Sequence, residues 1–142
     1  MALKKLTNSN EQLDAILRCL NHWSKIADEN IKTAIVDGVQ ITETSLSCNH
    51  NDFRNPSDLI IDLASIENSQ IDSHTLKLAL EYLVSEKLIK YDMCYTHKDI
   101  TGYRILYRGK VFIENGGFKE KFNLDNLSKQ NALYNESRIR GL

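Results

Sequence analysis

The chain has 142 residues, 42% of them hydrophobic and 26% charged, and a formal net charge of −1. This length suits one domain with an appended arm, and the apolar fraction is enough for a packed core. One proline and six glycines exclude a linker-rich or low-complexity protein, and no apolar run approaches the roughly 18 residues that span a bilayer.

The amino-terminal residues are too few and too polar for a secretory signal. The three cysteines are odd in number and widely spaced, which fits a reducing compartment. We therefore expect a soluble, cytoplasmic protein with no membrane partner.

A first helix is predicted to begin at Ser9, which with Gln12 resembles a capping box, and to end near Ala27. Apolar residues recur along it at helical spacing and should face the core: Leu13, Ile16, Leu17, Leu20, Trp23 and Ala27.

Residues 28–56 allow two interpretations. Asp37-Gly38 lies between two β-branched runs, 31–36 and 39–42, which favours a hairpin. The first run also fits a short helix ended by Gly38, and we prefer the helix. The polar stretch from Thr42 to Asn55 is expected to be a loop, and 28–56 could be an insertion.

Two further helices follow, the first starting at Pro56 and the second capped by Asp72 or Ser73. The first should bury Leu59, Ile60, Leu63 and Ile66. The second should bury Leu76, Ala79, Leu80, Leu83 and Val84, and turn outward Ser73, His74, Lys77, Leu78, Glu81, Tyr82 and Ser85.

Residues 88–95 and 103–107 predict paired strands joined by a tip at 96–102. A short helix over 109–115 should end at Gly116 in a left-handed conformation. The rest of the chain predicts a helical arm that packs on a neighbour, too irregular for a coiled coil.

The motif Tyr103-Arg-Ile-Leu-Tyr-Arg-Gly109-Lys-Val-Phe112 resembles small bacterial and phage winged helix-turn-helix proteins, in which a wing strand ends in Y-x-I-T-x-x-G-x-x-F. The segment 80–89 resembles their L-x-x-L-x-x-x-G-L-I passage from helix to strand. The resemblance covers about residues 57–118. It departs at Leu106, where the family has a capping threonine, and at Lys87, where it has a glycine.

The resemblance implies an α+β fold, a mostly helical winged helix-turn-helix with a two-stranded wing and a C-terminal helical arm. Residues 1–118 would form the winged-helix domain and 119–142 the arm. Family members are commonly DNA-binding regulators, although some use the fold for protein contacts.

The charge distribution allows a nucleic-acid surface. Residues 1–70 carry net charge −4 and 71–142 carry +3, while 87–110 alone carries +4. The hypothesis is a non-enzymatic, homodimeric regulator that binds double-stranded DNA, with its dimer contacts in 1–10 and 118–142. The resemblance puts these residues at the DNA: Ser73, His74, Thr75, Lys77, Lys90, Lys98 and Arg104.

The alternative is a protein-interaction module, such as a phage or host-defence accessory protein. The helix that Asp72 or Ser73 caps has a single lysine and no arginine on its outward side. That side also carries Leu78, Glu81 and Tyr82, which suit a protein partner. The basic hairpin could then be a solvated edge. A third option is a ligand sensor with a pocket between the first helix and 28–56.

No cofactor or metal is expected. Each cysteine has a histidine nearby (Cys19-x-x-His22, Cys48-x-His50, Cys94-x-x-His97), but no closed zinc spacing exists, and Cys19 should face the core with His22 in solvent. An enzyme is not expected either, because phosphate-loop and nucleophile motifs are lacking. Asp58 and Asp62, one helical turn apart, are interpreted as a solvated helix side.

Overall fold

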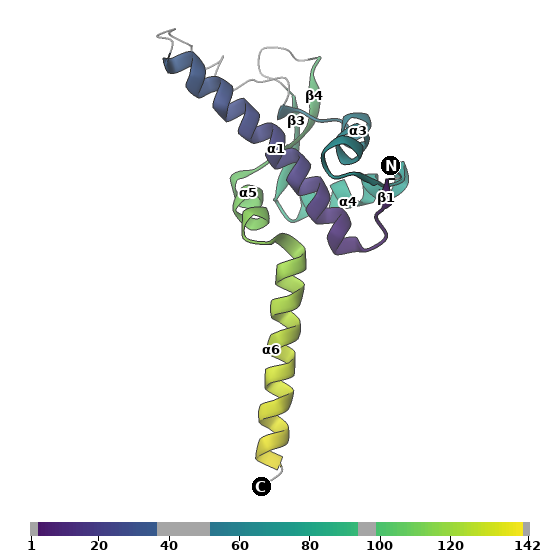
Figure 1. The fold of residues 1–142 in the computed structure, drawn as a ribbon, viewed down its shortest axis with the longest axis vertical. Coiled ribbons are helices and arrows are strands. Elements are labelled where there is room, and N and C mark those ends of the chain that lie inside the picture. The colour runs from purple at the N-terminus through teal and green to yellow at the C-terminus, as the bar shows by residue number, and fades with distance from the viewer. Residues whose placement is uncertain (1–2, 37–51, 94–98, 141–142) are drawn as a thin grey trace.

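The computed structural model describes residues 3–36, 52–93 and 99–140, with side chains described in 3–27, 52–93 and 99–129. This part of the chain is α+β and mostly helical, with an antiparallel hairpin (Figure 1). Its elements are β1 (Lys4–Lys5), α1 (Ser9–Val36), α3 (Pro56–Ile66), β2 (Ser69–Gln70), α4 (Ser73–Ser85), β3 (Ile89–Met93), β4 (Thr101–Ile105), α5 (Tyr107–Glu114) and α6 (Gly117–Arg140).

Helix α1 is longer than the sequence predicts. It runs unbroken past Ala27 to Val36, so the strand interpretation of 31–36 is wrong and the preferred helix is continuous with the first one. Its cap also differs, because the side chain of Asn8, and not Ser9, accepts hydrogen bonds from the amides of Asn10 (2.9 Å) and Glu11 (3.2 Å). The Asp37-Gly38 turn and the run 39–42 lie outside the described residues.

The core lies where α1 crosses α3, α4, α5 and the hairpin. Helices α1, α3, α4 and α5 and both hairpin strands contribute large buried side chains: Ile16, Leu17, Leu20, Leu59, Leu63, Leu76, Leu80, Leu83, Ile89, Ile105 and Ile113. The predicted inward stripe of α4 is confirmed except at Val84, which is 37% exposed. In α3, the prediction for Ile60 is wrong, since it is also 37% exposed.

The end of the predicted 42–55 loop belongs to no helix or strand, but it packs into the core. Phe53 is 4% exposed, and Arg54 forms a backbone bridge with Tyr103 of β4, with N–O distances of 3.0 and 2.7 Å. The rest of that segment, 42–51, lies outside the described residues. Asn55 then caps α3 in a full capping box with Asp58, ahead of Pro56 at the first helical turn.

The predicted hairpin is confirmed, but its strands begin and end at other residues than the sequence predicts. Strand β3 pairs with β4 in the register Ile89↔Ile105 to Met93↔Thr101, so the second strand begins and ends two residues earlier than predicted. Helix α5 consequently begins at Tyr107, and not at Gly109. Its N-cap, Leu106, makes no side-chain cap bond, as the departure from the family motif indicates.

Two chain reversals use left-handed residues. After α4, the amide of Lys87 donates to the carbonyl of Val84 and the amide of Leu88 to that of Leu83, a Schellman motif with Lys87 at φ 59°. After α5, Gly116 (φ 104°) and Gly117 (φ 65°) turn the chain into α6. The predicted arm is therefore helical, and it extends away from the globular part (Figure 1).

Candidate functional site: helix α4 and the hairpin

Helix α4 is fixed at both ends by its own sequence. Asp72 caps it, accepting from the Thr75 amide and hydroxyl, each at 3.0 Å. These hydrogen bonds, first that of the hydroxyl and then that of the amide, lower the pKa of Asp72 from its ordinary value. The buried leucines of α4 attach it to the core, so its opposite side must face solvent.

We call that side the outward face of α4. The residues predicted to turn outward are all exposed: Ser73, His74, Lys77, Leu78, Glu81, Tyr82 and Ser85. Leu78 is 53% exposed and Tyr82 46%. The Tyr82 ring lies 6.0 Å from that of Phe118, so the base of α6 supports it from one side.

The residues predicted to bind DNA differ in how far their side chains are free to make contacts. Ser73, His74 and Lys77 are exposed on the first turns of α4. Thr75 is half-buried, and its hydroxyl is already engaged with Asp72. Lys98 lies outside the described residues.

The remaining predicted cations are engaged with carboxylates. The Lys90 ammonium is 2.9 Å from Asp92, whose pKa is lowered chiefly by this hydrogen bond and further by the Met93 amide. Arg104 is 2.8 Å from Asp52, and its guanidinium lies 5.2 Å from the centre of the Phe53 ring. Arg104 thus ties β4 to the segment before α3.

Sequence reasoning missed a second arginine of this kind. Arg54 forms a two-pronged ion pair with Asp62 (2.7 and 2.8 Å) and stacks over Trp23 at 4.4 Å. The prediction that Asp58 and Asp62 share a solvated side is therefore wrong, since Asp62 is only 2% exposed. The signal in the sequence was Asp62, a charged residue beside the buried positions of α3. Its partner Arg54 lies before the helix and could not be identified from the helix alone.

The hairpin adds apolar surface beside α4. Tyr91 is 58% exposed and Met93 50%, on the same side of the hairpin as the core pair Ile89 and Ile105. The Tyr91 and Tyr103 rings meet edge to face at 5.1 Å. Burial raises the pKa of Tyr103, and the electrostatic effects of Tyr91 and of Glu81 on α4 raise it further.

The described residues contain no group of three or more His, Cys, Asp or Glu side chains that could hold a metal ion. Cys19 is fully buried, and burial raises the pKa of its thiol to about 12, while His22 is exposed. The placement predicted for this pair is thus confirmed. The pairs Cys48–His50 and Cys94–His97 lie outside the described residues.

No helix in the described ranges combines the length and apolar character needed to cross a membrane. Comparison with protein-family models, curated proteins and solved structures gives no match for this chain. Function is therefore inferred from the residues of the chain itself.

Proposed function

We propose that this chain is a non-enzymatic winged helix-turn-helix module that binds another protein through the outward face of α4. The order of elements supports the architecture: α3 and α4 form the helix pair, β3 and β4 form the wing, and the bridge from Arg54 to β4 supplies a third strand position.

The observation that carries the proposed function is the exposure of Leu78 and Tyr82 on the helix that would otherwise read DNA. Neighbouring apolar side chains on an exposed surface mark contact sites, and tyrosine is enriched in protein interfaces. Glu81 between them would repel phosphate and would attract a basic group of a protein partner.

The pairing of the hairpin cations supports the same conclusion. A phosphate contact by Arg104 or Lys90 would have to compete with Asp52 or Asp92. Breaking the half-buried Arg104 pair would also leave Asp52, which is 6% exposed, without that cation.

The test is a pull-down with Leu78→Lys as the variant and Ile61→Lys as the matched control, since Ile61 is a 63% exposed apolar residue on α3. We expect a partner that is retained by the unmodified chain and by Ile61→Lys, and lost with Leu78→Lys. Equal retention by both variants would show that the outward face of α4 is not the contact.

DNA binding by a homodimeric regulator is the second candidate function, and the exposure of Ser73, His74 and Lys77 at the start of α4 favours it. A helix start of this kind can meet a phosphate. For this function Leu78→Lys should strengthen DNA binding, because it adds a cation beside Lys77, so one variant separates the two candidates by the direction of its effect.

A further inference from the structure

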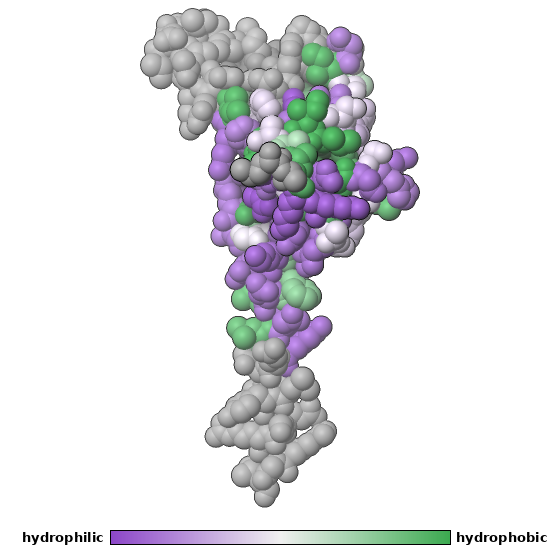
Figure 2. All heavy atoms as spheres, turned by 45° about the vertical axis from the view of Figure 1, so that its right-hand side comes forward, coloured by the Kyte–Doolittle hydropathy of each residue, from purple (hydrophilic) through white to green (hydrophobic). Residues whose placement is uncertain are grey.

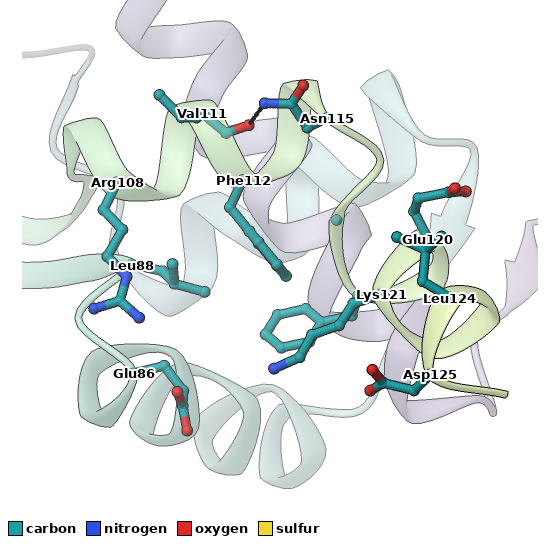
Figure 3. A pocket seen from close by; sticks show the side chains of 12 residues that line it. Glu86, Leu88, Arg108, Val111, Phe112, Asn115, Glu120, Lys121, Leu124 and Asp125 are labelled. Atoms are coloured by element: carbon teal, nitrogen blue, oxygen red, sulfur yellow. Dashed lines mark hydrogen bonds between the residues drawn. The ribbon is translucent and has the colours of Figure 1, made fainter. Parts of the chain in front are cut away.

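An apolar groove lies at the base of α6. It has a volume of about 470 Å³ and is bounded by the end of α4, by α5 and by the first turns of α6. Leu88, Val111, Phe112, Phe118 and Leu124 supply its apolar lining, and charged groups surround them: Glu86, Arg108, Glu120, Lys121 and Asp125. Figure 3 shows Phe112 reaching into the groove from α5, with Lys121 and Asp125 beside it on α6.

Beyond this groove, the described part of the chain offers α6 little to pack against. Phe118 is buried, but every side chain from Lys119 to Lys129 is exposed except Asn126, which is half-buried. Phe122, Leu124 and Leu127 are 54–55% exposed. Figure 2 shows apolar residues among polar ones on the first turns of the projecting helix.

Such a helix needs a partner. The 24 residues of α6 make it about 36 Å long, and helices in water are stabilised mainly by packing of an apolar side. Leu124 is exposed on α6 and also lines the apolar groove, so a partner that covers the groove covers this residue as well.

We propose that this partner is a second copy of the chain, whose α6 crosses antiparallel at Asn123 and lies over the groove. The two-fold axis lies at the level of Asn123 along the helix, on the side that carries Lys121 and Asp125. It places position 121 of each helix opposite position 125 of the other. Lys121 then meets Asp125 of the second copy, and the symmetry closes two such ion pairs. Phe122 and Leu124 lie on either side of the crossing.

Charge selects this direction. A parallel pair would bring Lys121 against Lys121 and Asp125 against Asp125, which is repulsive. The antiparallel pair turns both residues into attractive contacts around an apolar groove. This association is independent of the partner proposed for α4.

The experiment exchanges the two charges in separate chains. Lys121→Glu and Asp125→Lys each turn two attractive contacts into two repulsive ones, so each variant alone should dimerise about tenfold more weakly than the unmodified chain. Mixed together they restore both ion pairs, so native mass spectrometry should show a heterodimer in preference to either homodimer.

The mixture separates this contact from effects within one helix. Lys121 and Asp125 are also one turn apart on α6, but an intrahelical change persists after mixing and cannot produce a selective heterodimer. Lys119→Glu changes an exposed residue of α6 that is outside the groove lining and on the other side of the helix from Lys121 and Asp125, so it should leave dimerisation unchanged. A chain that stays monomeric at hundreds of micromolar, or a mixture without preferred heterodimer, would overturn the proposal.

Discussion

Lys87 holds a backbone conformation that glycine adopts at lower cost. Its φ is 59°, at the position that follows the end of α4 in the Schellman motif. A non-glycine residue pays roughly 1 kcal/mol there. Lys87→Gly should therefore raise the free energy of unfolding by up to about 1 kcal/mol, as measured by urea denaturation.

A matched control uses the same substitution at an ordinary helical position. Lys77 is exposed in the interior of α4, so Lys77→Gly should lower stability by about 1 kcal/mol. Opposite signs for the two changes are expected. A destabilising Lys87→Gly would mean that the backbone at residue 87 is not left-handed.

Cys19 should be unreactive in the folded protein. It is fully buried, and burial raises the pKa of its thiol to about 12, so the nucleophilic thiolate is scarce at neutral pH. Iodoacetamide labelling followed by peptide mapping should modify Cys19 in denaturant and leave it unmodified in buffer. Equal labelling rates in both conditions would contradict this burial.

At the scale of elements, Asp14 sets the start of α6. Its buried carboxylate accepts from the amides of Phe118 (2.7 Å) and Lys119 (3.0 Å), and a side chain at Gly117 would collide with it. Asp14→Ala leaves these amides unpaired and should cost about 2 kcal/mol. Hydrogen exchange should speed up at both amides.

Asp14→Asn is the conservative comparison, because its side-chain carbonyl keeps one acceptor. We expect it to lose less stability than Asp14→Ala and to protect the first turn of α6 partly. If Asp14→Ala left both amides as protected as before, Asp14 would not be the group that caps α6.

The elements that were predictable are those with local signals. The Asn55-Pro56 start of α3, the Asp72 cap of α4 and the helical spacing of its leucines predict their positions well. The register of the hairpin was not predictable to the residue, since the turn signal is spread over 96–102. A helix over 31–36 was the preferred prediction, but its continuity with the first helix was missed because the apolar spacing of that helix stops at Ala27.

The candidate site was predictable only in part. The outward face of α4 follows from helical periodicity, and the exposure of Leu78 and Tyr82 is as expected. The engagement of Arg104 could not be foreseen, because its partner Asp52 is far away in sequence within a stretch expected to be loop. Whether a basic side chain of the hairpin is available for a ligand therefore depends on ion pairs with other elements.

At the scale of the whole molecule, the pair Arg54–Asp62 joins α3 to the segment beside β4 and, through Trp23, to α1. The side chains are 15% and 3% exposed, so removing one charge leaves the other buried without compensation. Asp62→Asn should cost about 3 kcal/mol in a denaturation experiment.

Asp58→Asn is the control on the same helix. Asp58 lies in the capping box of α3 and is only half-buried, so its change should cost under about 1 kcal/mol. Similar costs at the two positions would indicate that the ion pair does not hold these elements together.

The central claim is that the outward face of α4 contacts a protein and not DNA. Its most direct test is fluorescence anisotropy of a mixed-sequence duplex titrated with the unmodified chain at low and at moderate salt. We predict no saturable binding tighter than about 100 µM at low salt, where non-specific phosphate contacts are strongest. Low-salt binding that weakens steeply with salt, and loses about one unit of salt slope in Lys77→Ala, would contradict the claim.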